Sequence, residues 1–256
     1  MLIDTHCHLD AAEFGDNQAE LISSARIAGV GRIIVPSVER ANFETVYTLC
    51  ARFPGCLPAY GIHPMYVDHA RIDDLAVLRE YLAKKNPVAI GEIGLDFFVE
   101  NRDEERQEYY FAEQLKLARE FDLPVLLHVR RSQDRVLKHL RRIRVRGGIA
   151  HAFNGSMHQA REFIKLGFKL GFGGAATYSR ATRLHSLIRE LPLSSIVLET
   201  DAPDMPPSFL ARPNPNRPEY LPRIAEILAG LRMISPEKLV LATGENAMSV
   251  LRLPAA

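Results

Sequence analysis

The sequence predicts an α/β protein, a (β/α)8 TIM-type barrel with an extra helix at its C-terminus. Eight short apolar runs alternate with longer amphipathic stretches along the chain, and each run is continuously hydrophobic. Continuous hydrophobicity is typical of parallel strands whose two faces are both covered. The length of 256 residues also suits such a barrel. A closed parallel barrel surrounded by helices is therefore the simplest architecture for this pattern.

The first half of the chain is expected to supply three strand and helix pairs. A strand at 3–10 opens the chain, and Leu21, Ile22 and Ala25 then recur at helical spacing. Gly29 is expected to end that helix, which begins near residue 17. The remaining elements of this half are a strand at 33–36, a helix at 42–53, a strand at 57–61 and a helix at 73–84.

The second half continues the alternation. A fourth strand is expected at 88–92, running into 93–96, and a long helix follows at 103–121. The remaining strands are expected at 125–128, 148–151, 168–172 and 196–201. A proline-rich stretch at 202–222 stiffens a long loop and does not separate domains, and a helix at 235–251 follows it. We therefore expect residues 1–256 to form a single domain.

Composition limits the classes of function. With 32 Lys and Arg against 31 Asp and Glu, the net charge is +1, so any contact with nucleic acid or a membrane must be local. The three cysteines form no Cys-x-x-Cys pair, which favours free thiols in a reducing compartment. No apolar run has the length of a membrane span, and the first residues do not resemble a signal peptide. We expect a soluble cytoplasmic protein with no membrane partner.

His6 and His8 begin the argument for a metal site. Side chains two residues apart in an extended strand point to the same face, so both imidazoles can share one cation. Further imidazoles and carboxylates follow other apolar runs, at the end of the barrel where active sites are built. Six ligands exceed the needs of one catalytic zinc and favour two metals with one carboxylate between them. The six candidates are His6, His8, Glu92, His128, His151 and Asp201.

Six segments, five of which contain these residues, share a wider pattern. They are Ile3-Asp4-Thr5-His6-Cys7-His8-Leu9-Asp10, Gly61-Ile62-His63-Pro64, Gly91-Glu92-Ile93-Gly94-Leu95-Asp96, His128 to Arg130, His151-Ala152-Phe153-Asn154-Gly155 and Glu199-Thr200-Asp201-Ala202-Pro203. In this order they resemble the TatD family of metal-dependent deoxyribonucleases, which belongs among the amidohydrolase-like barrels. The resemblance extends through Thr243-Gly244-Glu245-Asn246-Ala247 and so covers the whole chain.

The resemblance implies how the ligands are shared between the metals. One metal would be held by His6, His8, Glu92 and Asp201, and the other by Glu92, His128 and His151, with Glu92 bridging. Ala152 and Asn154 stand where many members carry Cys and Ser or Thr, which bears on the substrate and not on the metals.

The expected chemistry is hydrolysis of an ester by metal-activated water. Two divalent ions, zinc, magnesium or manganese, would activate the water and steady the attacked and leaving oxygens. Asp201 and Glu92 are the expected catalytic carboxylates, and Asp201 can also accept the proton of the water. Arg130, two residues beyond His128, is expected to bind a substrate phosphate. His63 can ligate a metal, but a substrate or supporting contact is favoured.

Three classes of function fit these residues. The first is a deoxyribonuclease that acts as an exonuclease on single-stranded or frayed DNA ends, with nucleic acid as its substrate. The second is a hydrolase of a small amide, ester or phosphoester, or of aminoacyl-tRNA esters, on the same barrel. The third is a metal-bound scaffold without turnover, which the complete ligand set disfavours. The sequence does not indicate the oligomeric state.

Overall fold

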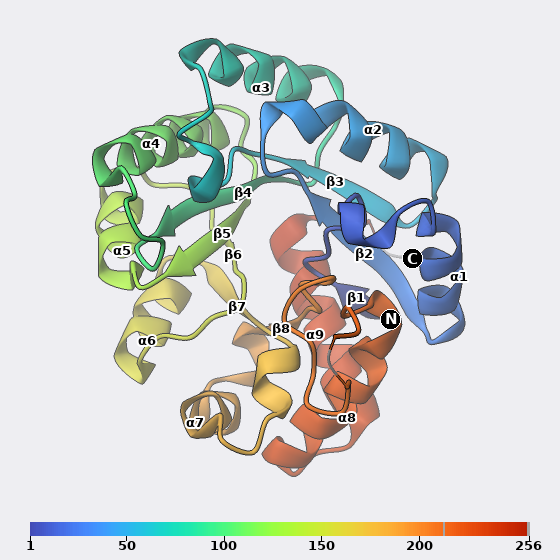
Figure 1. The fold of residues 1–256 in the computed structure, drawn as a ribbon. Coiled ribbons are helices and arrows are strands. Elements are labelled where there is room, and N and C mark those ends of the chain that lie inside the picture. Colours follow the sequence, from blue (N-terminus) through green and yellow to red (C-terminus); the bar gives the residue numbers. More distant parts are fainter. Residues whose placement is uncertain (212, 255–256) are drawn as a thin grey trace.

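Eight parallel strands form one sheet, in the order β1 to β8, in the computed structural model, which describes residues 1–211 and 213–254. The strands surround a central axis and the helices lie outside them (Figure 1). This is the (β/α)8 barrel that the sequence predicted. The strands are β1 (Leu2–Asp4), β2 (Val30–Pro36), β3 (Cys56–Tyr60), β4 (Ala89–Asp96), β5 (Val125–Arg130), β6 (Gly148–Ala150), β7 (Phe168–Phe172) and β8 (Ile196–Leu198).

Some of the α-helices of the described residues begin directly after a residue whose side chain caps the first turn. The carboxylate of Asp103 accepts a hydrogen bond from the backbone N–H of Arg106 at 2.9 Å, which caps the long fourth helix. In the described part of the chain, no helix has the length and apolar character needed to cross a bilayer. The helices are α1 (Gln18–Ile27), α2 (Phe43–Arg52), α3 (Ile72–Lys84), α4 (Glu104–Glu120), α5 (Gln133–Arg142), α6 (Met157–Lys165), α7 (Thr182–Glu190), α8 (Leu221–Arg232) and α9 (Pro236–Leu251).

Helix α8 was not among the elements expected from the sequence. Its first turn contains Pro222, which the analysis had assigned to the end of the proline-rich loop. Proline is tolerated in the first turn of a helix because the N–H it lacks has no partner within the helix there. A proline-rich composition therefore concealed the start of this helix.

The expected terminal helix α9 covers the N-terminal end of the barrel. One apolar cluster takes a single residue from each of seven strands, and these residues lie at or near the start of their strands in β4, β5 and β6. Ala247 and Leu251 of α9 belong to the same cluster, and the helix packs against β1, β7 and β8. With this end closed, the opposite end is left for the functional site. The strand residues are Ile3, Ile34, Ala59, Ala89, Leu126, Ile149 and Val197.

The barrel closes through residues that follow β1 and β8. The backbone N–H of Thr5 donates to the carbonyl of Leu198 at 3.1 Å, and that of Asp201 donates to the carbonyl of His6 at 2.8 Å. Asp4 strengthens the closure, because its two carboxylate oxygens accept from the backbone N–H and the hydroxyl of Thr200, at 2.9 and 2.6 Å. The same closure brings His6 next to Asp201.

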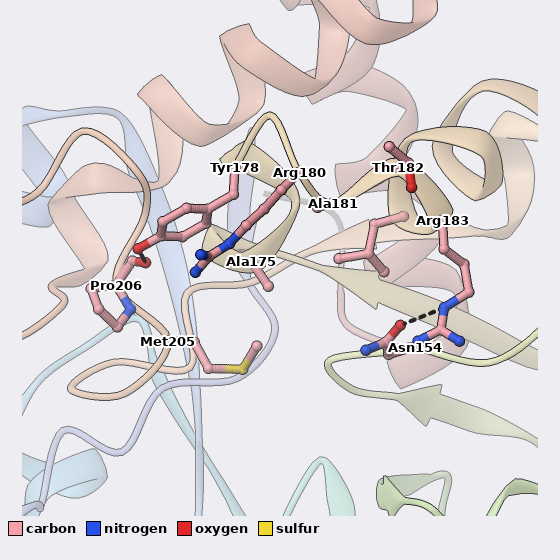
Figure 2. Close-up of a pocket in the computed structure, with 10 residues that line it drawn as sticks. Asn154, Ala175, Tyr178, Arg180, Ala181, Thr182, Arg183, Met205 and Pro206 are labelled. Atoms are coloured by element: carbon pink, nitrogen blue, oxygen red, sulfur yellow. Dashed lines mark hydrogen bonds between the residues drawn. The ribbon is translucent and has the colours of Figure 1, made fainter.

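A hollow of about 640 Å³ lies at the end of the barrel opposite α9. It is lined by residues from the segments that follow β6, β7 and β8, among them Asn154, Ala175 and Met205 (Figure 2). We call this hollow the basin.

Candidate metal centre

His6, His8 and Asp201 come together where the two ends of the sheet meet. The Nε2 atoms of the two imidazoles are 3.2 Å apart, and Oδ1 of Asp201 lies 3.7 Å from His6 Nε2 and 3.8 Å from His8 Nε2. The strands are shorter than the sequence analysis expected, so all three residues follow their strands, and Asp201 has a φ of 58°. Residues 5–8 nevertheless remain extended enough to turn both imidazoles to one side.

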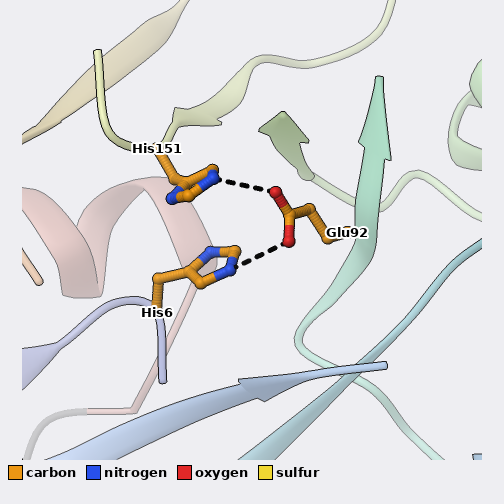
Figure 3. A group of neighbouring side chains, drawn as sticks. All are labelled: His6, Glu92 and His151. Carbon is orange, nitrogen blue, oxygen red and sulfur yellow. Dashed lines mark hydrogen bonds and ion pairs between the residues drawn. The ribbon is translucent and has the colours of Figure 1, made fainter. Parts of the chain in front are cut away.

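Glu92 lies within β4, is buried, and divides its two carboxylate oxygens between two groups of imidazoles. Its Oε2 atom is 3.1 Å from His6 Nε2 and 3.6 Å from His8 Nε2. Its Oε1 atom is 2.9 Å from His128 Nδ1 and 2.8 Å from His151 Nε2. Figure 3 shows the carboxylate between the rings of His6 and His151, with one oxygen turned to each. One side chain thus contacts both halves of the candidate centre.

The protonation of these groups in the absence of an ion reflects their crowding. Burial lowers the pKa of His6 to about 4, with the neighbouring His151 acting in the same direction. Burial also lowers the pKa of His151, but the charges of Glu92 and Asp201 outweigh this effect and raise the pKa to about 10. The imidazoles around Glu92 outweigh its burial and hold the pKa of its carboxyl well below the usual range. Protons on some imidazoles therefore balance a carboxylate that a cation could neutralise instead.

The donor atoms fit divalent cations. Three triplets, His6–Glu92–His151, His6–His8–Asp201 and His63–Glu92–His128, each have ligand atoms that all lie within 4.8 Å of one another. Imidazole nitrogens and carboxylate oxygens are ligands of zinc and other first-row metals. Where these nitrogens carry no proton, their lone pairs face those of the carboxylate oxygens and repel them. A cation between the atoms would remove this repulsion.

Comparison with known proteins identifies the family. A family model described as TatD related DNase matches residues 3–252. The chain belongs to the TatD family. It is 42% identical over 256 residues to the uncharacterized metal-dependent hydrolase YjjV of Escherichia coli (strain K12), covering 98% of each chain. The crystal structure of this TatD homolog superimposes with a TM-score of 0.95 over 99% of the present chain and 98% of the other, at 41% identity.

A second relative carries a more specific name. The chain is 31% identical over 262 residues to the 3′-5′ ssDNA/RNA exonuclease TatD of Erwinia billingiae (strain Eb661), covering 99% of this chain and all of the relative. The family resemblance drawn from the motifs is confirmed, and the protein is a metal-dependent hydrolase. The names of the relatives do not agree on a substrate.

In this TatD-family protein, the tautomer of His63 bears on its role. Its Nδ1 atom accepts a hydrogen bond from the backbone N–H of Met65 at 3.1 Å, so in the neutral ring Nε2 carries the proton. Burial lowers the pKa of His63 well below its usual value, which keeps the ring neutral. The Nε2 atom lies 3.6 Å from Oε1 of Glu92. A donor at this position favours the expected substrate or supporting contact over metal ligation.

Asp96 is a supporting residue that the sequence analysis quoted within a motif but gave no role. Its Oδ2 atom lies 2.9 Å from Nε2 of His128, and its Oδ1 atom accepts from the backbone N–H of Phe98 at 2.8 Å. When Nε2 carries the proton, the unprotonated Nδ1 of His128 faces Glu92. A carboxylate in the position of Asp96 commonly orients a metal-ligating imidazole. The signal was present in the spacing, because Glu92 and Asp96 are four residues apart on one strand and so share a face.

Glu199 lies behind His151 in a similar way. Its Oε1 atom is 3.7 Å from Nδ1 of His151 and accepts a hydrogen bond from the backbone N–H of Ala152. Burial raises the pKa of the Glu199 carboxyl to about 8. The side chain requires glycine on the neighbouring strand, since a Cβ at Gly171 would lie 2.0 Å from its Oε2 atom. The alternation Glu199, Thr200, Asp201 was the signal that it faces the same interior.

Arg130 lies at the rim, at the last position of β5. Its side chain is 49% exposed, and its NH1 atom is 3.9 Å from Oδ2 of Asp96. The guanidinium stacks on the exposed ring of Phe98, 3.8 Å from the centroid, and that of Arg131 lies 4.5 Å from the same centroid. Arg130 was expected from the sequence, whereas Phe98 was not, because it comes near Arg130 only through the pairing of β4 with β5 in the sheet.

Proposed function

We propose that the protein is a two-metal exonuclease that cleaves phosphodiester bonds at single-stranded or frayed DNA ends. The observation that carries this proposal is the carboxylate of Glu92, whose oxygens face two separate groups of imidazoles at 2.8 to 3.6 Å. A carboxylate shared in this manner suits a bridge between two ions. Paired ions are a recurrent means of cleaving phosphodiesters.

The proposed ligands divide into two sets that share Glu92. One ion would be held by His6, His8, Glu92 and Asp201, and the other by Glu92, His128 and His151. The preponderance of imidazole favours zinc over magnesium. When bound, such ions lower the pKa of water to about 7 and stabilise negative charge on the attacked and leaving oxygens.

Other side chains would act on the substrate and the proton. Asp201 is only 13% exposed yet faces the open end of the barrel, where it can accept the proton of the attacking water. The Nε2–H of His63 can donate to a phosphate oxygen. Arg130 can hold a phosphate in a charge-assisted hydrogen bond, with the exposed ring of Phe98 beside it available to a base.

A nucleic acid substrate is further supported by a relative that is named a 3′-5′ ssDNA/RNA exonuclease. The rim offers two guanidiniums next to an exposed aromatic ring, a combination that suits single strands. A hydrolase of small neutral esters would have no need of these cations. The second class, hydrolysis of small esters or of aminoacyl-tRNA esters, therefore serves as the alternative outcome of the test.

The test is a digestion of 3′-labelled and 5′-labelled single-stranded oligonucleotides by purified protein of known metal content. The proposal expects a ladder of products that shortens from one end, disappears with a chelator and returns when zinc or manganese is added. The same strand annealed into a blunt duplex is the matched control and should be cut more slowly. Hydrolysis of simple esters with intact oligonucleotides would reject the nuclease and favour the small-molecule hydrolase.

A further inference from the structure

The basin beside the metal centre has a cationic lining. Arg180 and Arg183 contribute guanidiniums to its wall, and the residues described along it include no aspartate or glutamate. Figure 2 shows Arg180 with Tyr178 on one side of the hollow and Arg183 on the other. A cleft lined by charges of one sign concentrates the electric field more than the same charges on a flat surface do, because the protein around the cleft has a low dielectric constant.

Within the described residues, neither arginine is neutralised by a neighbouring carboxylate. Among residues 1–211 and 213–254, no carboxylate lies within ion-pair distance of Arg180 or Arg183, whereas Arg79, Arg135 and Arg141 each pair with a glutamate at 3.0 Å or less. Arg183 is instead positioned by Asn154, whose side-chain oxygen accepts from its Nε atom at 3.1 Å. The NH1 and NH2 groups of Arg183 thus have no carboxylate to neutralise them.

The remaining wall is ordered by local contacts. The hydroxyl of Tyr178 donates to the carbonyl of Pro206 at 3.1 Å, and the guanidinium of Arg180 lies 5.4 Å from the centroid of the tyrosine ring. Helix α7 begins at the basin, and its N-cap residue Ala181 supplies no side-chain acceptor to the first turn. The positive end of this helix adds to the field of the arginines.

The basin leads to the reaction centre. A smaller cavity of about 40 Å³ shares Asn154 and Met205 with the basin and is lined further in by Glu199 and Asp201. Asn154 itself follows the proposed ligand His151 by three residues. A group that occupies the basin therefore lies next to the carboxylate proposed to accept the proton of water.

We propose that the basin is a nucleotide subsite, in which Arg180 and Arg183 each bind one phosphate of the strand beside the scissile one. Its volume of about 640 Å³ lies within the usual range of ligand sites, about 300–1,000 Å³. It adjoins the ends of β6, β7 and β8, whereas Arg130 lies on β5, so a strand would be held on both sides of the centre. This inference rests on the proposed nuclease function, because it assumes a polyphosphate chain as substrate.

The test separates phosphate binding from catalysis. The variant Asp201→Asn, saturated with manganese, is titrated with a fluorescein-labelled thymidine 12-mer at several salt concentrations, alone and with Arg183→Ala or Arg180→Ala added. Each arginine removed should weaken binding several-fold and reduce the slope of log affinity against log salt by about 0.7, the value for one phosphate contact with a single strand. Arg183→Lys should retain the slope, and Arg189→Ala, which removes an exposed arginine of α7 outside the basin lining, should match the parent.

Turnover by the enzyme with Asp201 intact completes the test. Arg183→Ala should raise KM for the oligonucleotide. For bis(4-nitrophenyl) phosphate, which has no neighbouring phosphate, kcat and KM should stay within twofold of the wild-type values. Salt slopes equal to that of Arg189→Ala, with oligonucleotide cleavage intact, would overturn the subsite and leave the nuclease standing. Reduced slopes in a protein that cleaves no oligonucleotide would support the phosphate site and reject the nuclease.

Discussion

The Nε2 atom of His128 lies 2.9 Å from Oδ2 of Asp96, on the side of the ring away from Glu92. Asp96 is fully buried, and His128 and the backbone N–H of Phe98 outweigh this burial to lower the pKa of its carboxyl. The carboxylate therefore remains ionised and fixes which nitrogen of His128 faces the candidate centre. The ligand is positioned by a residue that would itself contact no ion.

We expect Asp96→Asn to weaken binding of the ion held by His128. Loss of an orienting carboxylate typically lowers metal affinity by about 10- to 100-fold, while the other ion should be little affected. Competition with a chromophoric chelator measures both affinities, and Asp68→Asn, at an exposed position, is the matched control. Two affinities equal to those of the control would show that Asp96 does not support the site.

Glu92→Gln should remove more metal than any single histidine change. Glu92 contacts both groups of imidazoles, whereas His128 belongs to only one of these groups. We expect the metal content to fall well below one ion per chain in Glu92→Gln and to remain near one in His128→Ala, measured by atomic emission after dialysis. A Glu92→Gln protein with two ions and near-normal turnover would contradict the bridging assignment.

Arg130→Ala should weaken substrate binding without emptying the centre. The guanidinium lies at the rim and is half exposed, so its removal costs the phosphate contact and leaves the imidazoles in place. We expect KM for oligonucleotides to rise about tenfold or more, as for a lost charge-assisted hydrogen bond, with unchanged metal content. Arg144→Ala, which removes an exposed charge from the barrel wall, is the control. Loss of metal in Arg130→Ala would show a structural role instead.

Metal affinity should rise with pH from neutrality through the pKa of His8, about 8, toward that of His151, about 10. In the ion-free protein, the pKa of His151 is about 10, because Glu92 and Asp201 outweigh the effect of burial, and that of His8 is raised to about 8 against burial by Glu92. Both rings therefore carry a proton at pH 7 that a bound ion must displace, and raising the pH removes that competition. Calorimetric titration with manganese in buffers of different ionisation enthalpy should detect the released protons. An affinity independent of pH, with no proton release, would contradict these assignments.

The sequence predicted the barrel because eight predominantly apolar runs alternate with helical stretches along the chain. It predicted the candidate ligands because alternation and strand order place His6, Glu92 and Asp201 at one end of the fold. It did not predict α8, where a proline in the first turn resembled a loop. The stacking of Arg130 on Phe98 depends on the contact of β4 with β5, and the basin depends on loops from three strands, so neither has a local pattern in the sequence.

We propose that this centre performs metal-dependent hydrolysis of nucleic acid with Asp201 as proton acceptor. Asp201→Asn keeps the size and one oxygen donor of the side chain but removes most of its basicity. The most direct measurement is single-turnover cleavage of a labelled single-stranded oligonucleotide by wild type and Asp201→Asn, both saturated with divalent ion. We predict that the variant still binds the strand and cleaves it at least about a hundred-fold more slowly, the usual cost of losing a general base. Cleavage by Asp201→Asn at the wild-type rate, or a wild type that binds two ions and hydrolyses no oligonucleotide, would contradict the account.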